Sequence, residues 1–337
     1  IDFRLKQAEP LMQAGQMVAY AQLPIQEYSF LTPKTAESKF KQRVKDKAKE
    51  DITVVGDRYQ IAFDRRTGWL KHYEVDGKSL LGANGTLRPN FWRAVTDNDM
   101  GANINITHKV WKNPVMTLQT LEAKQQKTGT MVTAFYRMDS VQALLTLQYF
   151  IGENGTIQVS QQLQTNKKAS MPNLFRFGMV MDLPYEMEKS VYYGRGPIEN
   201  YPDRKLSQRI GRYEQMADDQ FYPYIRPQET GTKGDMRWWK QTDRQGIGLK
   251  VVADAPFYAS ATHYTIPDVD DGDRKEQRHS YQLKRSCFTE LYLDGAHAGV
   301  GGIDSWSGWA EALEPYQVKC EDRAFTFWLL PTETVGD

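Results

Sequence analysis

From Ile52 onward the chain alternates apolar and polar residues with a period of two, which is the spacing of a β-strand with one buried face. The segment RYQIAF places three apolar side chains on one face, namely Tyr59, Ile61 and Phe63. A later run does the same with Leu145, Leu147, Tyr149 and Ile151. No long segment with the helical period of about 3.6 residues interrupts these runs, so the pattern predicts an all-β fold.

A tight hairpin is predicted where two of these runs meet. Glu153-Asn154-Gly155 follows the first run, and apolar residues then alternate with polar ones at Ile157, Val159 and Leu163. Asn-Gly readily adopts the positive φ angles that a tight β-turn requires. The same alternation recurs in LFRFGMVMDL (174–183), TELYLD (289–294) and FTFWLL (325–330). We therefore expect a large antiparallel β-sandwich with long loops over residues 52–337.

The first 51 residues have a different character. Residues 1–33 hold two strand-like runs around a turn at Ala14-Gly15, and an isolated hairpin is only marginally stable. We expect them to be the last strands of a domain whose earlier strands are absent. Residues 34–51 are highly charged and predict a solvated linker with a thin apolar stripe of Ala36, Phe40, Val44 and Ala48. Because the chain starts at Ile1 instead of Met, we expect a piece of a longer polypeptide.

Charge and composition argue against several classes of protein. The 43 Lys and Arg residues balance the 42 Asp and Glu residues, so no broad basic field is available for nucleic acid. No apolar stretch of about 18 residues predicts a membrane span, and both the cytoplasm and the periplasm fit the composition. Cys287 and Cys320 are too few for a disulfide framework, and they could either pair or be buried separately.

Three loop blocks carry the side chains best suited to binding a ligand. They are FWRAVTDNDMG (91–101), YYGRGPIENYPDR (192–204) and DGAHAGVGGIDSWSGW (294–309). Each combines turn residues with Asp, Asn, Arg or Trp, which can hydrogen-bond polyols or stack on sugar rings. In an all-β scaffold, function concentrates in such loops while the strands maintain the shape.

Five residues of these blocks are candidates for substrate binding: Trp306, Asp304, Asp97, Asn98 and Gly101. Trp306 follows a glycine-rich turn that Asp304 or Ser305 can anchor, and its ring could either stack on a pyranose or close an edge of the core. Consecutive Asp and Asn residues before Gly101 favour Asx-turns followed by a hinge. For the pair Trp238-Trp239 we expect one buried ring and one half-exposed ring.

The sequence predicts no catalytic residue and no metal site. A retaining glycosidase needs two carboxylates about 5 Å apart, and spacing along an all-β chain does not reveal such a pair. Glu199 and Glu229 are the best isolated candidates, but we expect each to fix its own loop through backbone hydrogen bonds. The five histidines form no metal-binding cluster, and no G-x-S-x-G nucleophile motif occurs.

Four motifs in this order resemble the C-terminal small-chain domain of bacterial β-galactosidases of glycoside hydrolase family 2. The matching segments are FWRAVTDNDMG (91–101), YGRGPIENYPDR (193–204), PYIRPQETG (223–231) and LDGAHAGVGGIDSWS (293–307). The resemblance covers about residues 52–337, and residues 1–27 resemble the end of the immunoglobulin-like domain that precedes it. It implies a large antiparallel super-sandwich similar to that of galactose mutarotases.

The resemblance also implies an accessory role. The domain would complete the active-site rim and the sugar acceptor subsite of a retaining β-galactosidase, which hydrolyses terminal β-galactosides. The catalytic glutamates, together with magnesium and possibly sodium, would belong to a TIM barrel that is absent here, so we expect no cofactor in this chain and no activity from it alone. The implied partners are the β-galactoside or its leaving sugar, the N-terminal domains and possibly a homo-oligomer.

Matched by position, Trp306 corresponds to the family's tryptophan that stacks on the sugar at the leaving-group or acceptor subsite. Gly101 and the residues after it correspond to a mobile loop near the active site. The family usually carries proline at the position of Val95, and often after DSWS, where this chain has Gly308-Trp309. We expect the second difference to alter the acceptor site.

Two other functions use the same residue types. An aldose 1-epimerase needs a positioned acid and base, and Glu229 with His263 or His297 could supply them. A galactoside-binding module could instead use exposed aromatic rings, with candidates at Trp238, Trp239, Trp306 and Trp309.

Overall fold

The computed structural model describes residues 1–30, 33 and 42–332. The strands of its N-terminal half are β1 (Asp2–Arg4), β2 (Met17–Tyr20), β3 (Arg43–Lys45), β4 (Ile52–Val55), β5 (Tyr59–Phe63), β6 (Leu70–Val75), β7 (Lys78–Ser79), β8 (Leu87–Asn90), β9 (Thr117–Gln126), β10 (Gly129–Met138), β11 (Ala143–Ile151) and β12 (Ile157–Thr165). Those of the C-terminal half are β13 (Arg176–Pro184), β14 (Lys189–Gly196), β15 (Arg209–Met216), β16 (Lys233–Thr242), β17 (Gly248–Thr262), β18 (Phe288–His297) and β19 (Arg323–Pro331).

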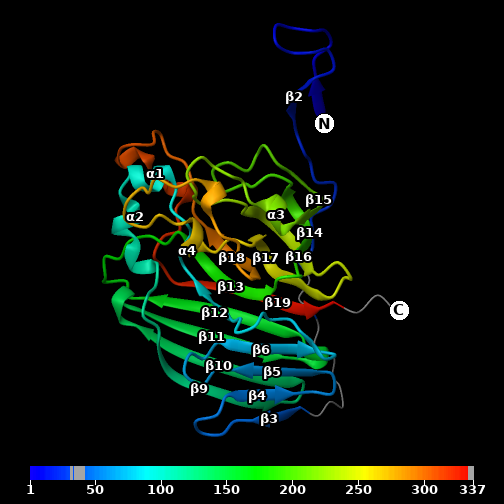
Figure 1. Cartoon of the computed structure of the whole chain (residues 1–337), viewed down its shortest axis with the longest axis vertical. Helices are drawn as coiled ribbons and strands as arrows, with labels where there is room; N and C mark the ends of the chain where they lie inside the picture. The colour runs from blue at the N-terminus through cyan, green and yellow to red at the C-terminus, as the bar shows by residue number, and fades with distance from the viewer. Residues whose placement is uncertain (31–32, 34–41, 333–337) are drawn as a thin grey trace.

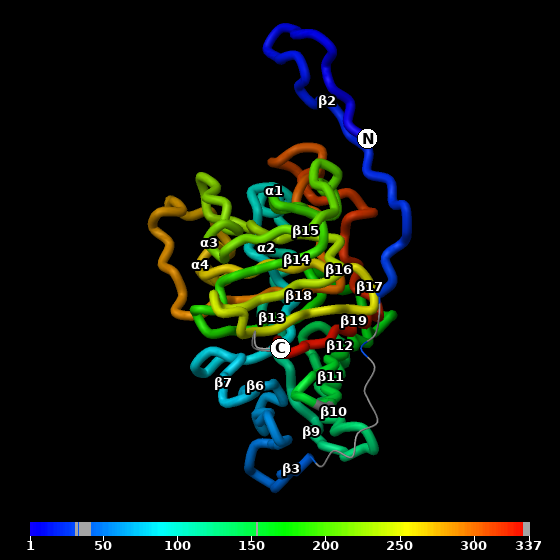
Figure 2. Tube along the Cα trace, turned by 90° about the vertical axis from the view of Figure 1, so that its right-hand side faces the viewer, coloured from blue at the N-terminus to red at the C-terminus, as the bar shows by residue number. Residues whose placement is uncertain are grey.

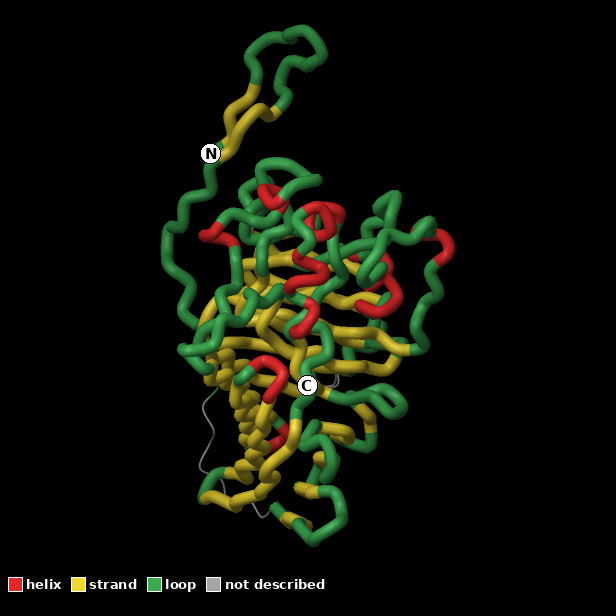
Figure 3. The backbone as a smooth tube through the Cα atoms, turned by 90° about the vertical axis from the view of Figure 1, so that its left-hand side faces the viewer, coloured by secondary structure: helices red, strands yellow, loops and turns green. Residues whose placement is uncertain are grey.

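The helices are short and lie in the connections between strands. The α-helices are α1 (Asp97–Gly101), α2 (Ile104–Thr107), α3 (Ala217–Gln220) and α4 (Ile266–Val269). The 3-10 turns are η1 (Lys109–Trp111), η2 (Asp139–Val141), η3 (Glu153–Gly155), η4 (Ser280–Gln282), η5 (Gly308–Ala310) and η6 (Glu314–Tyr316). Figure 3 shows most of the helical turns among the loops of the upper half of the molecule, beside the strands. The structure therefore confirms the all-β antiparallel class.

The strands form one continuous antiparallel ladder with a branch. Its order is β9-β10-β11-β12-β19-β17-β18-β13-β8-β6-β5-β4-β3. The long strand β17 also pairs with β16, and β14 and β15 follow β16 in turn. This order places β8, β13 and β18 side by side although they are far apart in the sequence, which brings their flanking loops to one end of the sheet.

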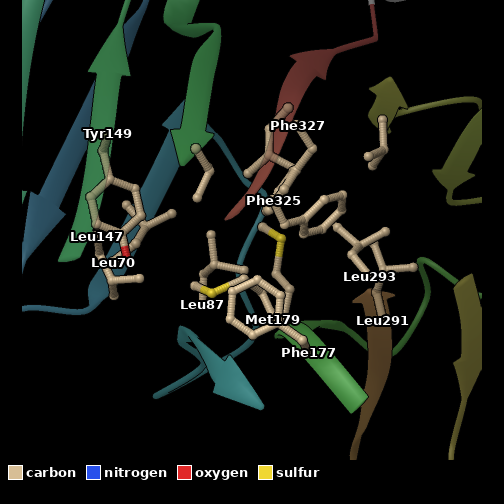
Figure 4. Close-up of a cluster of buried hydrophobic side chains, with 14 of the residues drawn as sticks. Leu70, Leu87, Leu147, Tyr149, Phe177, Met179, Leu291, Leu293, Phe325 and Phe327 are labelled. Carbon is tan, nitrogen blue, oxygen red and sulfur yellow. The ribbon is translucent and has the colours of Figure 1, made fainter. Parts of the chain in front are cut away.

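The two ends of the ladder face each other across a buried apolar layer. In Figure 1, β4, β5 and β6 lie in front of β9, β10 and β11. The ring of Phe63 on β5 contacts that of Tyr149 on β11, with centroids 4.9 Å apart. Figure 4 shows the continuation of this layer, where Leu87, Met179 and Phe327 come from strands of the two halves of the chain. The alternation of apolar residues thus forms the core that the sequence predicts.

The predicted strands and the Asn-Gly turn are confirmed. The side chains that alternate in β5, β11 and β12 are buried: Tyr59, Ile61, Phe63, Leu145, Leu147, Tyr149, Ile151, Ile157, Val159 and Leu163. Between β11 and β12, Asn154 and Gly155 take φ angles of 58° and 75°. Those positive angles let the two strands pair in register from Ile151 with Ile157 to Ala143 with Thr165.

The N-terminal hairpin stands apart from the ladder. Strands β1 and β2 pair antiparallel around a turn in which Gly15 has a φ of 81°. Figure 2 shows this hairpin projecting beyond the loops at the top of the molecule. Within the range predicted to be a linker, residues 34–41 lie outside the described residues, whereas β3 pairs with β4 and is the last strand of the ladder. Residues 43–45 are therefore strand, not solvated linker.

Candidate functional site

Loops from four separate parts of the chain meet around one polar cavity. We call residues 91–101, 193–204, 223–231 and 293–309 the four-block cluster. The cavity has a volume of about 140 Å³ and is lined by Thr96, Asn98, Tyr201, Arg204, Tyr224, Gln228, Glu229 and Val300. All four blocks contribute to this lining, so the segments that the sequence singled out do converge in space. Among these residues the sequence predicted only Asn98 to bind substrate.

The tryptophan turn is held by its own aspartate. The carboxylate of Asp304 accepts hydrogen bonds from the backbone N–H groups of Trp306 at 3.1 Å and Ser307 at 3.0 Å. It also accepts one from the Ser307 hydroxyl at 2.6 Å. The ring of Trp306 is 78% exposed and that of Trp309 is 68% exposed. The turn therefore fixes its backbone and leaves two indole rings in solvent, which excludes the interpretation of Trp306 as closing a core edge.

Helix α1 packs directly against this turn. A Cβ atom placed on Gly101 would lie 2.3 Å from the carbonyl oxygen of Ser305, so only glycine permits this approach. The side-chain amide of Asn98 donates hydrogen bonds to the carbonyl oxygens of Asp304 at 2.9 Å and Ala310 at 3.3 Å. The structure thus brings together four of the five predicted residues: Asn98, Gly101, Asp304 and Trp306.

Asp97 joins the cluster through a different neighbour. Its carboxylate pairs with Arg226 at 3.0 Å and Lys275 at 2.9 Å, and accepts a hydrogen bond from Gln228 at 3.1 Å. Burial raises the pKa of Asp97, but the hydrogen bond from Lys275 and the charge of Arg226 outweigh it and hold the pKa below its usual range. Asp97 therefore ties α1 to the block at 223–231 through a charged network.

Glu199 also links two blocks, contrary to the prediction that it fixes its own loop. Its carboxylate accepts hydrogen bonds from the backbone N–H of Gly231 at 2.6 Å and the hydroxyl of Thr230 at 3.0 Å. The same group pairs with Arg204 and accepts from the Tyr224 hydroxyl, both at the cavity wall. Glu199 thus orients the arginine and tyrosine that line the cavity.

Below the cavity, arginine–carboxylate pairs hold the loops together. Arg93 is fully buried and pairs with Asp99 at 2.9 Å, while also donating to the carbonyl oxygen of Gly299 at 3.0 Å. Asp203 accepts hydrogen bonds from the backbone N–H groups of Val300 at 2.9 Å and Gly301 at 2.8 Å. These contacts fasten the glycine-rich part of the last block to the first two blocks.

A second network of buried charged side chains includes residues of β13 and β18. Arg176 pairs with Asp294 at 3.0 Å, and the side chains of both residues are almost completely inaccessible. Glu229 accepts hydrogen bonds from Thr232 at 2.7 Å and Tyr201 at 3.3 Å, which are side-chain contacts and not the predicted backbone ones. Burial raises the pKa of Glu229, but the charge of Arg176, the contact with His297 and the charge of Arg93 together outweigh burial and lower the pKa to about 2. Glu229 is therefore an ionised part of this network.

His297 lies beside Glu229, with 3.7 Å between its Nε2 and Oε1 of the carboxylate. Its Nδ1 donates to the carbonyl oxygen of Ala298 at 2.8 Å. Burial, followed by the charge of Arg176, lowers the pKa of this imidazole to about 4. The other candidate histidine, His263, contacts Asp218 and Thr289 instead of Glu229.

The remaining sequence predictions have mixed outcomes. Trp239 is fully buried and stacks on Tyr192 with centroids 4.7 Å apart, whereas Trp238 is half-buried under Lys250, as the split of this pair predicted. The prediction that Trp239 could belong to a galactoside-binding surface is therefore wrong, because this ring presents no face to solvent.

Cys287 and Cys320 do not pair. Within the described ranges, no group of three or more His, Cys, Asp or Glu side chains is arranged to hold a metal ion. Helices of bilayer-spanning length and apolarity are also absent from this part of the chain.

Comparison with known families places these motifs in context. The family model described as the β-galactosidase small chain matches residues 55–329, which is most of the chain. This chain belongs to the β-galactosidase small-chain family. The match includes all four blocks of the cluster, so the resemblance inferred from those motifs is confirmed.

Several curated proteins share this region. A β-galactosidase of Priestia megaterium is 28% identical over 308 residues, which cover 91% of this chain and 29% of that protein. A β-galactosidase of Lactobacillus delbrueckii subsp. bulgaricus is 32% identical over 260 residues, which cover 76% of this chain and 25% of that protein. The chain thus spans between a quarter and a third of the length of these relatives. Among solved structures, a galactose mutarotase related enzyme from Lactobacillus acidophilus aligns with a TM-score of 0.46 at 7% identity, over 85% of this chain and 98% of that chain.

Proposed function

We propose that this small-chain domain is an accessory part of a retaining β-galactosidase, in which it completes the active-site rim and the subsite for the leaving or accepting sugar. The observation that carries this proposal is the exposed indole of Trp306, which is 78% accessible on a turn fixed by Asp304. An exposed aromatic face on a turn with a fixed backbone suits the C–H side of a pyranose, and the gain is about 1 kcal/mol beyond its buried area.

The polar groups beside the turn support the same role. Arg204, Tyr224 and Gln228 line the cavity of about 140 Å³ together with Asn98. Their hydrogen bonds to Glu199 and Asp97 keep these side chains in place. A rim built from an exposed ring on a fixed turn and from oriented donors would bind the leaving or accepting sugar, without taking part in bond breaking.

Catalysis is assigned to domains outside this chain. The proposal places the nucleophile and acid/base glutamates in a TIM barrel of the same polypeptide, where a pair about 5 Å apart would act. The magnesium and sodium ions expected in the full-length enzyme would be held there too. On this view the isolated chain does not hydrolyse a chromogenic β-galactoside, whereas the full-length enzyme does.

The decisive experiment compares two exposed tryptophans in the full-length enzyme. Trp306→Ala should lower transglycosylation to an added acceptor sugar about tenfold, whereas hydrolysis of a nitrophenyl galactoside at saturating substrate should fall much less. Trp309→Ala is the comparison variant, because its ring is also exposed in the same turn, and its acceptor kinetics measure separately the contribution expected of Gly308-Trp309. Equal acceptor kinetics in wild type and Trp306→Ala would reject the acceptor role.

One alternative deserves a direct test because the structure places its residues together. Glu229 and His297 are neighbours, as an aldose 1-epimerase on this fold would require of an acid and a base. Their atoms are only 3.7 Å apart and both side chains are buried, which leaves no space for a sugar ring between them. Polarimetry of freshly dissolved α-galactose should therefore show the uncatalysed rate in the presence of this chain.

A further inference from the structure

Between α4 and β18 the chain contains a charged segment that packs against the four-block cluster without belonging to any of its motifs. We call residues 270–278, with the sequence DDGDRKEQR, the strap. Its backbone turns at Gly272, where φ is 74° and the N–H donates to the carboxylate of Asp270 at 2.9 Å. Such a composition is typical of a solvated loop, so the contacts that the strap makes with its neighbours are not evident from the sequence.

The start of the strap is fixed to the first block and to α2. The carboxylate of Asp270 accepts from Nε1 of Trp92 at 2.9 Å, and both side chains are buried. The side-chain amide of Asn105 donates to the carbonyl oxygens of Gly272 at 3.0 Å and Asp273 at 3.2 Å. Asn105 is itself buried, so these hydrogen bonds are shielded from water. The strap therefore begins from a fixed position beside α1 and α2.

Asp271 joins the strap to the block at 223–231. Its side chain is completely inaccessible, and its carboxylate pairs with Nη1 of Arg226 at 2.7 Å and with Nε of Arg278 at 3.0 Å. It also accepts a hydrogen bond from the backbone N–H of Glu276 at 3.1 Å. A buried carboxylate is costly unless its charge is paired and its oxygens accept hydrogen bonds, and Asp271 meets both conditions. The position of Arg226 is therefore set by the strap.

Arg226 extends the network from the strap to α1. Its Nε pairs with Asp97 at 3.0 Å, and Lys275 of the strap pairs with the same carboxylate at 2.9 Å. At the other end of the network, Arg278 lies 3.8 Å from Glu276. The side chains of this network alternate in sign and their charges sum to zero: Lys275, Asp97, Arg226, Asp271, Arg278 and Glu276. Asp271 is the least exposed of them, and its loss would separate the two halves of the network.

The residues that follow the strap hold the backbone of the same block. The hydroxyl of Ser280 donates to the carbonyl oxygen of Tyr224 at 2.7 Å, and Nδ1 of His279 donates to that of Ile225 at 3.0 Å. Tyr224 lines the cavity of the four-block cluster. The strap and the residues after it therefore contact successive residues of the block from Tyr224 to Arg226.

Two walls of the cavity meet at this network. One wall includes Asn98 of α1, and the other includes Gln228 of the block at 223–231. Between them, Nε2 of Gln228 donates to the carboxylate of Asp97 at 3.1 Å, and its Oε1 accepts from the backbone N–H of Asp97 at 3.2 Å. Because Arg226 holds Asp97 at the same time, the separation of the walls depends on where Asp271 places Arg226.

We propose that Asp271 is a positioning residue for the sugar acceptor, which acts through Arg226 and Asp97 to hold the two walls of the cavity at the separation that this sugar requires. The inference rests on the proposed role of the cavity as the subsite for the leaving or accepting sugar. Asp271 does not touch the sugar, since its side chain is completely buried and does not line the cavity. We therefore expect it to affect the affinity for the acceptor and not the bond-breaking step.

The test measures acceptor kinetics in the full-length enzyme that contains this chain, with glucose as the added acceptor and a nitrophenyl galactoside as the donor. Asp271→Asn keeps the shape of the side chain and removes its charge. The glucose concentration at half-maximal transglycosylation should rise about tenfold, while hydrolysis at saturating donor changes by less than about twofold. An unchanged acceptor affinity overturns the proposal. So does hydrolysis that falls as much as the acceptor affinity, because that result is expected of a purely structural residue.

A double variant tests whether the effect passes through Arg226. If Asp97 and Asp271 act through the same guanidinium, Asp97→Asn combined with Asp271→Asn should weaken acceptor binding no more than about twofold beyond the larger single effect. Fully multiplicative effects contradict this route. Lys109→Met is the matched control, because it removes the exposed partner of Asp273 in the strap and should leave the acceptor affinity within about twofold of wild type. An equal effect of Lys109→Met and Asp271→Asn counts against the specific role of Asp271.

Hydrogen exchange distinguishes a failure of this inference from a failure of the proposed function. In the full-length enzyme without sugar, Asp271→Asn should speed amide exchange about tenfold in the peptides that cover residues 97–105 and 223–231, whereas Lys109→Met should not. Unchanged exchange in a folded Asp271→Asn enzyme overturns the positioning role, whatever the result for Trp306→Ala. Faster exchange with unchanged acceptor kinetics in both Asp271→Asn and Trp306→Ala overturns the acceptor role on which the inference rests.

A second variant decides the question if Asp271→Asn does not fold. Arg226→Lys keeps the positive charge but lacks the planar fork that contacts both Asp97 and Asp271. The glucose concentration at half-maximal transglycosylation should rise about fivefold in this variant, again with hydrolysis nearly unchanged. A folded Arg226→Lys enzyme with wild-type acceptor affinity overturns the proposal.

Discussion

The four-block cluster has two layers that use the same residue types for opposite purposes. In the inner layer, Arg93 and, from β13 outside the blocks, Arg176 are fully buried against Asp99 and Asp294. In the outer layer, the turn that begins at Asp304 leaves two indole rings mostly in solvent. A single motif, such as DSWSGW or FWRAVTDNDMG, therefore contains both residues that fix loops and residues that face solvent, where a ligand could bind. Stability and binding should therefore respond to different substitutions.

Removal of Arg176 should have the largest effect on stability. The substitution Arg176→Met leaves Asp294 buried without its partner and removes the positive charge near Glu229. Breaking a buried pair in this way costs about 3–5 kcal/mol. Urea denaturation of the purified chain measures the loss.

The control for that experiment is an exposed arginine pair. Arg137 contacts Asp139 at 2.9 Å, and both side chains are more than half exposed. Arg137→Met should cost no more than about 1 kcal/mol, because solvent screens such pairs. If both variants lose the same free energy of unfolding, the inner layer does not hold the cluster.

The substitution Gly101→Ala tests the close packing of α1 against the tryptophan turn. Gly101→Ala places its Cβ against the backbone of Ser305, so α1 and the tryptophan turn must separate. We expect a loss of about 1–3 kcal/mol in the free energy of unfolding. Gly308→Ala lies in the same turn and meets no atom within 4 Å, so it should change stability by less than about 0.5 kcal/mol. Indistinguishable melting curves for the two variants would show that the close approach is unimportant.

Much of the fold follows from local pattern, and the structure shows why. The alternation around Tyr149 and the turn at Asn154-Gly155 act on neighbouring residues, so the sequence specifies β11, β12 and their hairpin. The exposure of Trp306 was open in the sequence, because a tryptophan after a glycine turn fits either a core edge or a surface. The ring is exposed because tertiary contacts hold the turn at the surface, namely the hydrogen bonds to Asp304 and the packing of Gly101 against Ser305.

The cavity residues show what pattern alone does not reveal. Tyr201 and Arg204 lie within the block YYGRGPIENYPDR, yet nothing in their spacing shows that Glu199 contacts Thr230 and Gly231. That contact depends on the ladder order, which is a property of pairings between distant strands. A cavity of about 430 Å³ beside β8 was missed for the same reason, since β8 and β18 both pair with β13 from distant positions in the sequence.

Within the inner layer, the imidazole of His297 should contribute a loss of stability in acid, and burial of Asp294, which raises the pKa of that carboxyl to about 7, acts in the opposite direction. Burial lowers the pKa of His297 to about 4 in the folded chain, whereas the unfolded imidazole titrates near 6.5. Between these values the unfolded state binds more protons, so this contribution is complete above pH 6.5 and is lost as the pH falls toward 4. Between pH 6.5 and 4, the expected loss in the free energy of unfolding from His297 is about 1 kcal/mol per pH unit. Burial lowers the pKa of His108 to about 4 as well, so this residue adds to the slope.

The variant His297→Asn isolates the contribution of one imidazole. Its amide can still donate to the carbonyl oxygen of Ala298, but it does not titrate. Urea unfolding at pH 7, 6 and 5 should show a shallower decline in this variant, by about 1 kcal/mol per unit. Parallel declines in variant and wild type would mean that His297 is not held neutral by the inner layer.

The smallest effect on stability should come from the residue on which the proposed function depends. Trp306→Ala removes a ring that is 78% exposed, so the free energy of unfolding should change by less than about 0.5 kcal/mol. Trp239→Ala is the matched contrast, because that ring is fully buried and its loss should cost about 3–5 kcal/mol. Side-by-side urea denaturation of the two variants measures this difference. A large loss of free energy of unfolding in Trp306→Ala would show that the indole packs against the protein in solution. Trp306 would then belong to the layer that fixes the loops and not to the layer that faces a ligand.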